Sequence, residues 1–269
     1  MQPLTDTLLN TVRAIAQEAG EHLKAFYQQS LAPHLKADNT PVTEADLFLS
    51  RFISEKLQAL TPNVPILSEE QCDIPLAERR HWQEYWIIDP LDGTQQFLDK
   101  TDQFSVVIGL VQANRPVLGV IHAPILNKTY FAKQDGGAFL QENQQIRPLV
   151  AASQNLPKTL TITVGSTICE EQVCRFLNEP YQAQFLTYGS SSLKAGLVAE
   201  GKADCYIRLG DTGEWDTAVA EVLLREVGGK IFDFHFQLLT YNQRETWINP
   251  NFVMVGANFI SEQKVFSFE

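Results

Sequence analysis

The sequence has few cysteines, no long apolar run and no recognisable export signal. Its four cysteines in 269 residues are scattered and form no C-x-x-C pair, so a structural zinc site is not expected and a reducing compartment is the simpler interpretation. No apolar run reaches the roughly 18–20 residues that a transmembrane helix requires. The first residues lack the basic and apolar regions of a signal peptide. We therefore expect a cytoplasmic location, and peripheral attachment to the cytoplasmic face of the inner membrane stays open.

Basic residues are also scarce. The chain has 21 Lys and Arg against 32 Asp and Glu, which gives a net charge of −11. Proteins that bind nucleic acid polymers gain most of their affinity by neutralising phosphates with Lys and Arg, so this class of partner is not expected. A small anionic substrate remains compatible with the charge, because a bound cation reverses the local sign of a site.

The hydrophobic pattern predicts a mixed α/β protein with two lobes. Apolar residues recur at helical spacing over residues 5–27 and 43–60, and again over 191–200 and 214–227. Short apolar strands are expected between and around these helices, at 64–67, 85–88, 104–111, 116–122, 129–132, 162–165, 185–188 and 204–209. The weakest junction lies near residues 149–157. We therefore expect an N-terminal α+β lobe at 1–150 and a C-terminal α/β lobe at 151–269.

Acidic residues stand directly after two of the predicted strands. Glu69 follows one apolar strand and Asp89 follows the next, where a side chain is held by rigid backbone at the end of a sheet. Asp92 comes three residues after Asp89, across a proline, so a turn can bring both carboxylates to one point. The carbonyl oxygen of Leu91 lies between them. Mg²⁺ binds hard oxygen ligands of this kind, and the segment therefore predicts a magnesium site.

The next two residues favour an anion beside that site. Gly93 lets the backbone approach a phosphate closely, and a helix starting after Thr94 would present free N–H groups. Taken alone, D-G-T is more often an ordinary turn. The aspartate-nucleophile phosphatases carry D-x-D-G-T, whereas here two residues separate Asp89 from Asp92, so that covalent mechanism does not fit.

Four short motifs, distributed over nearly the whole chain, extend this pattern. They are PVTEAD at 41–46, SEE at 68–70, DPLDGT at 89–94 and WDTA at 215–218, with a Gly-Gly pair at 228–229. Together they resemble the inositol monophosphatase superfamily of lithium-sensitive, magnesium-dependent phosphatases. The resemblance implies a layered α-β-α-β-α sandwich of two lobes, with the site between them.

The resemblance also implies roles for individual residues. The metal ligands would be Glu69, Asp89, the Leu91 carbonyl, Asp92 and Asp216, and these ligands, apart from Asp89, would also contact the substrate together with Gly93 and Thr94. Asp46 and Thr94 would form a hydrogen-bonded pair that orients the attacking water and helps to deprotonate it, so no covalent nucleophile is needed. From its position alone, Asp46 is better interpreted as an acidic residue that interacts with a helix N-terminus, and only the resemblance reverses this.

Within the superfamily, the flanking segments are most similar to 3′(2′),5′-bisphosphate nucleotidases of the CysQ type. These segments are KADNTPVT at 36–43, LTPNVPILSEE at 60–70, GSSSLK at 189–194 and WINP at 247–250. The likeness implies removal of the 3′-phosphate of adenosine 3′,5′-bisphosphate, a by-product of sulfur metabolism, to leave AMP. It selects Lys194, Arg208 and the hydroxyl of Ser191 as ligands of the second phosphate.

Other interpretations remain at this stage. A different phosphatase of the superfamily would act on inositol phosphates or sugar phosphates, and a non-catalytic sensor of metal or nucleotide could share the fold. Lys194 and Arg208 could be solvated surface charges. Use of adenosine 3′-phosphate 5′-phosphosulfate, the number of metal ions, and the choice between monomer and dimer are also open.

Overall fold

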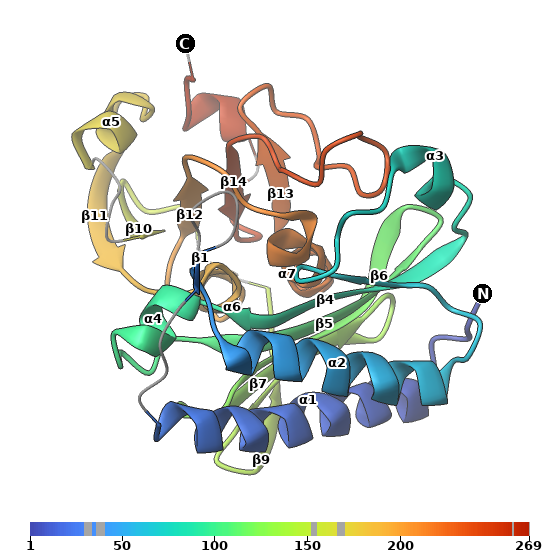
Figure 1. Ribbon diagram of the computed structural model, residues 1–269. Coiled ribbons are helices and arrows are strands. Elements are labelled where there is room, and N and C mark those ends of the chain that lie inside the picture. Colours follow the sequence, from blue (N-terminus) through green and yellow to red (C-terminus); the bar gives the residue numbers. More distant parts are fainter. Residues whose placement is uncertain (30–33, 36–40, 152–154, 166–169, 260, 269) are drawn as a thin grey trace.

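The computed structural model of the chain describes residues 1–29, 34–35, 41–151, 155–165, 170–259 and 261–268. Helices and sheets alternate in layers in the order α-β-α-β-α (Figure 1). The first layer consists of α1 (Asp6–Tyr27) and α2 (Glu44–Leu60). Each of these helices begins after a threonine N-cap, Thr5 and Thr43, whose hydroxyl accepts a backbone N–H of the first turn.

The second layer is a seven-stranded sheet in the order β3-β4-β5-β6-β7-β8-β9. Only the β3–β4 pair is parallel, and the remaining pairs are antiparallel neighbours along the chain. The strands are β3 (Ile66–Ser68), β4 (Glu84–Asp92), β5 (Ser105–Gln112), β6 (Arg115–Ala123), β7 (Lys128–Lys133), β8 (Gly137–Glu142) and β9 (Gln145–Pro148).

Both faces of the central strands are buried, which explains their continuous apolar runs. Along β5, Val106 and Ile108 pack toward α1 and α2, whereas Val107 and Val111 pack into a second core on the opposite face. This second core contains α6 (Ser191–Ala199) and α7 (Glu214–Glu226), which form the middle helix layer.

The fourth layer is a five-stranded sheet in the order β11-β10-β12-β14-β13. Its strands are β10 (Thr159–Val164), β11 (Gln182–Thr187), β12 (Cys205–Arg208), β13 (Lys230–Asp233) and β14 (Phe252–Val255). Its outer face packs against the short helix α5 (Glu170–Arg175) through Val173. The remaining elements are α3 (Leu76–Arg79), α4 (Thr94–Leu98), the 3₁₀ helix Glu262–Lys264 and the small ladder of β1 (His34–Leu35) with β2 (Pro41–Val42).

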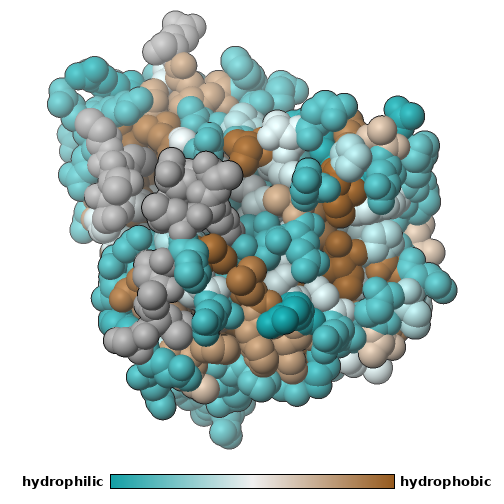
Figure 2. All heavy atoms as spheres, in the orientation of Figure 1, coloured by the Kyte–Doolittle hydropathy of each residue, from teal (hydrophilic) through white to brown (hydrophobic). Residues whose placement is uncertain are grey.

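The expected sandwich of α and β layers is therefore confirmed. The 1–150 segment supplies α1, α2 and the large sheet, and the later residues supply α6, α7 and the small sheet. The predicted turn at 36–40 lies outside the described residues, as does part of the predicted junction at 149–157. None of the described helices has an apolar stretch that could cross a bilayer. Hydrophilic residues cover most of the face in Figure 2, with hydrophobic ones in small patches.

Candidate active site and metal centre

A bulge in strand β4 brings Asp89 and Asp92 to the same side of the large sheet. Residues three apart on a regular strand point to opposite faces. Here Asp89 pairs with Val107 and Asp92 pairs with Ser105, so β4 carries one residue more than β5 over this stretch. The extra residue reverses the alternation after Pro90, a residue that cannot donate to the ladder. Leu91 consequently points into the opposite core.

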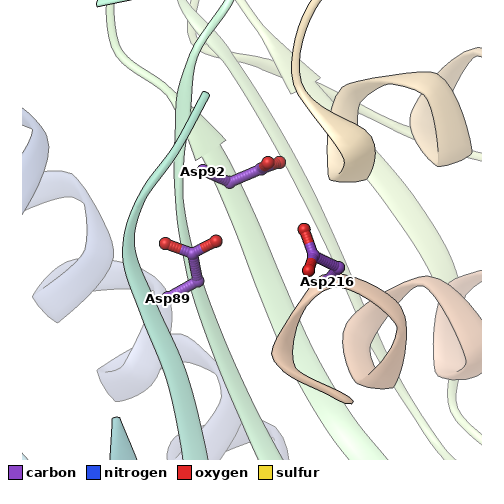
Figure 3. Close-up of side chains that lie close together, drawn as sticks. All are labelled: Asp89, Asp92 and Asp216. Carbon is purple, nitrogen blue, oxygen red and sulfur yellow. The ribbon is translucent and has the colours of Figure 1, made fainter. Parts of the chain in front are cut away.

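Asp216 approaches the same point from the middle helix layer. It occupies the third position of α7, where its Oδ2 accepts the N–H of Gly213 at 2.7 Å. Asp89, Asp92 and Asp216 each offer a carboxylate oxygen, and these three oxygens lie within 4.8 Å of one another. Figure 3 shows the three carboxylates turned toward a common space between the strand and the helix.

The electrostatics of this group favour a bound cation. Burial raises the pKa of Asp89 well above its usual value, and the charges of Glu69, Asp92 and Asp216 raise it further. The pKa of Asp216 is also raised well above its usual value, by burial first and then by Asp92 and Glu69, against an opposing hydrogen bond from Gly213. Clustered, buried carboxylates repel one another, and a divalent cation relieves that repulsion. The donor set is all oxygen and therefore suits a hard cation such as Mg²⁺.

Glu69 reaches this group from the neighbouring strand. It follows β3 directly, and its backbone N–H donates to the Ile88 carbonyl of β4 at 3.1 Å. Its charge raises the pKa of Asp46, Asp89 and Asp216. The parallel β3–β4 pair thus places Glu69 beside Asp89, although only β3 ends there and β4 continues to Asp92.

Asp46 has two sets of contacts. As the third residue of α2, it accepts the backbone N–H of Thr43 at 2.7 Å and the Thr43 hydroxyl at 2.6 Å, both on Oδ2. Its other oxygen lies 3.1 Å from the hydroxyl of Thr94. The same hydroxyl lies 3.2 Å from the Leu91 carbonyl, and it can donate to either oxygen. The pair expected from the sequence is present, and Asp46 also caps its own helix.

Gly93 connects the metal segment to Thr94. It has φ +96° and precedes α4, and the left-handed region that it occupies favours glycine. A Cβ at this position would lie 3.1 Å from the Gln103 carbonyl oxygen. The predicted helix after the D-G-T turn is therefore present, although it is only one short turn of five residues.

Asp92 is held by the start of α6. Its Oδ2 accepts the Ser192 N–H at 2.8 Å and the Ser190 hydroxyl at 2.5 Å, together with the Ser192 hydroxyl. Its Oδ1 accepts the Ser191 N–H at 3.1 Å. Ser105 of β5 lies behind this group, with its hydroxyl 2.7 Å from that of Ser192. Ser105, Ser190 and Ser192 were not among the site residues predicted from the sequence. The serine run at 190–192 was the available signal.

Glu69, Asp92 and Asp216 are among the residues that border a cleft of ≈ 330 Å³ between the large sheet, α4 and the start of α7. Arg208, at the end of β12, also lines it. One guanidinium nitrogen of Arg208 donates to the Asp211 carbonyl at 2.8 Å, and its buried Nε has no hydrogen-bond partner among the described residues. The cleft is lined by Pro41, Glu69, Asp89, Leu91, Asp92, Gly93, Thr94, Gln95, Gln96, Arg208, Asp211, Thr212, Gly213, Trp215, Asp216 and Ile248.

Lys194 and Ser191 are placed behind the cleft wall. The Lys194 ammonium donates to the carbonyls of Ser190 and Tyr188, at 2.9 and 3.1 Å, and the side chain is buried. Burial lowers its pKa to about 8, with Arg208 adding to the lowering and Asp92 opposing it. The Ser191 hydroxyl lies 3.4 Å from that of Tyr206. Contact of either residue with a substrate stays a prediction.

Known proteins resemble this chain in sequence and in overall fold. The sequence matches the inositol monophosphatase family over residues 4–261. It is 57% identical to the 3′(2′),5′-bisphosphate nucleotidase CysQ of Haemophilus influenzae, over 100% of both chains. The Escherichia coli protein of the same name is 36% identical over 91% of this chain and 98% of its own. The crystal structure of CysQ from Bacteroides thetaiotaomicron superposes with a TM-score of 0.78 at 30% identity, covering 94% of this chain and 98% of that one. The chain therefore belongs to the inositol monophosphatase family.

Proposed function

We propose that this protein is a magnesium-dependent 3′(2′),5′-bisphosphate nucleotidase that hydrolyses the 3′-phosphate of adenosine 3′,5′-bisphosphate to give AMP and inorganic phosphate. One observation carries the proposal: the carboxylates of Asp89, Asp92 and Asp216 converge in the same cleft as Arg208. A cation site and a guanidinium in one cleft suit a substrate with two phosphates. The identity to whole CysQ-type relatives supports the same substrate.

The metal site in this proposal uses oxygen ligands only. Glu69, Asp89, the carbonyl of Leu91, Asp92 and Asp216 would hold Mg²⁺, and the family resemblance adds inhibition by lithium. When bound, the cation offsets the charge of the reacting phosphate and makes water a better nucleophile. The carboxylates contribute by standing on rigid elements, a bulged strand and the first turn of a helix, so their oxygens are preorganised.

Asp46 and Thr94 would act on the attacking water. Burial raises the pKa of Asp46, against lowering by its hydrogen bonds from Thr43 and Thr94, which makes the carboxylate a better proton acceptor than a solvated one. Thr94 can pass a proton to Asp46 through the 3.1 Å contact while its oxygen orients the water. Because Thr43 holds the other oxygen of Asp46, the carboxylate is already fixed in place.

The second phosphate would be bound by Arg208. Its Nε is a buried donor that needs an acceptor, and a guanidinium binds a phosphate through two parallel hydrogen bonds. Lys194 and Ser191 stay in the proposed substrate site. The Lys194 charge acts close to Arg208 and makes that end of the cleft more positive, while direct contact with either residue requires them to turn out of their present hydrogen bonds.

The remaining parts of the proposal concern the chain as a whole. The lobes would be 1–150 and 151–269, with catalytic groups from both, and the protein would work in the cytoplasm on a small nucleotide. Adenosine 3′-phosphate 5′-phosphosulfate, which carries the same 3′-phosphate, is a second candidate substrate for the same site.

The test is phosphate release from adenosine 3′,5′-bisphosphate, with the nucleotide product identified by chromatography. The wild type should release phosphate and AMP only when Mg²⁺ is present, and lithium should inhibit it. Asp92→Asn should abolish turnover while the circular dichroism spectrum stays that of the wild type. Turnover by a folded Asp92→Asn protein would overturn the metal assignment, and no turnover of any phosphate ester would favour a non-catalytic sensor.

A further inference from the structure

We propose that Ser190 and Ser192 are positioning residues that lock one oxygen of Asp92, so that its other oxygen is presented to the metal. The inference rests on the proposed metal role of Asp92. Asp92 lies on the large sheet, and its carboxylate accepts hydrogen bonds from the start of α6, which belongs to the middle helix layer. The orientation of a central ligand is thus set by a segment about a hundred residues later in the chain.

The hydrogen bonds on Asp92 are unequally divided between its two oxygens. Oδ2 accepts the hydroxyls of Ser190 and Ser192 and the N–H of Ser192, and the Ser105 hydroxyl donates to it at a longer 3.5 Å. Oδ1 accepts the single N–H of Ser191, at 3.1 Å. A carboxylate oxygen with three or more donors has little capacity left for a cation, whereas an oxygen with one donor keeps a lone pair for it. The serines therefore select Oδ1 as the metal-binding atom.

The direction of these bonds differs from ordinary helix capping. In a simple N-cap, the serine oxygen accepts a backbone N–H of the first turn. Ser190 does this with Leu193 at 3.2 Å, but its hydroxyl hydrogen goes to Asp92. The Ser192 hydroxyl donates to Asp92 and lies 2.7 Å from the hydroxyl of Ser105. Capping alone needs neither the Ser192 hydroxyl nor a serine at 105.

The backbone at Ser190 is strained in order to make this contact. Ser190 has φ 52° and ψ 130° and is 4% exposed. Positive φ is uncommon outside glycine and is maintained only where the surroundings enforce it. Here the Lys194 ammonium holds the Ser190 carbonyl at 2.9 Å. A glycine would adopt the same backbone without strain, so the presence of a serine indicates that its hydroxyl is needed.

The experiment measures binding of Mn²⁺ to the full chain by electron paramagnetic resonance, without nucleotide. Groups that orient metal ligands typically contribute about 10- to 100-fold in metal affinity. We expect Ser190→Gly and Ser192→Ala each to raise the Mn²⁺ dissociation constant by about 10-fold or more. In steady-state kinetics, the Mg²⁺ concentration for half-maximal rate should rise in parallel, while KM for the nucleotide at saturating Mg²⁺ stays unchanged.

Ser190→Gly distinguishes an effect on metal binding from an effect on folding. Glycine tolerates the positive φ, so the melting temperature of the metal-free variant should stay near that of the wild type. Thr129→Val is the matched control. It removes a buried hydroxyl that is bonded to His122 at 2.9 Å on β7, away from the cleft. It should lower the melting temperature and leave Mn²⁺ binding unchanged.

The outcomes distinguish this inference from the proposed function. Asp92→Asn should weaken Mn²⁺ binding more than either serine variant. If Asp92→Asn weakens binding while Ser190→Gly and Ser192→Ala bind Mn²⁺ like the wild type, the serines do not position the ligand and the inference is wrong. If Asp92→Asn itself binds Mn²⁺ normally, the proposed metal site is wrong as well.

Discussion

Replacement of Arg208 should lower kcat/KM for substrates with two phosphates and leave kcat/KM for substrates with one phosphate nearly unchanged. Arg208 lines the cleft, keeps one nitrogen on the Asp211 carbonyl at 2.8 Å, and leaves its buried Nε without a partner among the described residues. A hydrogen bond to a charged group contributes about 1.5–3 kcal/mol. Each 1.4 kcal/mol is about a factor of ten, so Arg208→Met should lower kcat/KM for adenosine 3′,5′-bisphosphate by roughly 10- to 100-fold.

The comparison substrate is adenosine 3′-monophosphate, which lacks the second phosphate. Its kcat/KM should change little in Arg208→Met, because the metal site and the Asp46–Thr94 pair are untouched. Arg208→Lys keeps the charge but loses the planar fork, so its loss on the bisphosphate should be intermediate. Coupled phosphate-release assays at saturating Mg²⁺ give both constants. An equal loss on the two nucleotides would mean that Arg208 does not bind the second phosphate.

Three further predictions follow from other parts of the structure. Asp46→Asn should lower kcat by about 10²- to 10⁴-fold with Mn²⁺ binding retained; near-normal turnover would remove Asp46 from the proton path. Burial lowers the pKa of His122 to about 4 from its ordinary 6.5, so between these pH values the unfolded chain binds a proton that the folded chain does not, and the stability present above pH 6.5 is lost as pH falls toward 4. In urea titrations the wild type should therefore lose about 2 kcal/mol of unfolding free energy between pH 7 and 5 through this residue, and His122→Asn should not. The same pH slope in both proteins would refute this. Gly119→Ala would place a Cβ 2.5 Å from a Val219 methyl and should lower the free energy of unfolding by about 1–3 kcal/mol. If the variant unfolds at the same urea concentration as the wild type, α7 moves to make room for the methyl group and the prediction is wrong.

The sequence predicted much of the fold because its strongest signals are local. The helical spacing over 5–27 and 43–60 corresponds to α1 and α2, and the helices near 191 and 214 correspond to α6 and α7. Strands β8 and β9 were not predicted, since β9 is exposed along its length and carries no apolar run. Strands β13 and β14 were also absent from the prediction. They follow a glycine pair and a long irregular segment.

The candidate site was predictable in its residue types but not in its geometry. Asp89 and Asp92 were expected after a strand, whereas β4 continues through both and places them together by a bulge. A bulge depends on pairing with β5, which the β4 sequence alone does not specify. Lys194 was expected to contact a substrate, and that contact stays a prediction. Its ammonium donates to the carbonyl oxygens of Tyr188 and Ser190, and the sequence has no local signal for the positive φ of Ser190.

The proposed substrate is tested most directly by measuring kcat/KM for adenosine 3′,5′-bisphosphate and for inositol 1-phosphate in parallel, at the same Mg²⁺ concentration. Arg208 in the carboxylate cleft and the identity to CysQ-type relatives predict a much higher kcat/KM for the bisphosphate. A higher kcat/KM for the inositol ester would contradict the proposed substrate and assign the same metal centre to an inositol phosphatase.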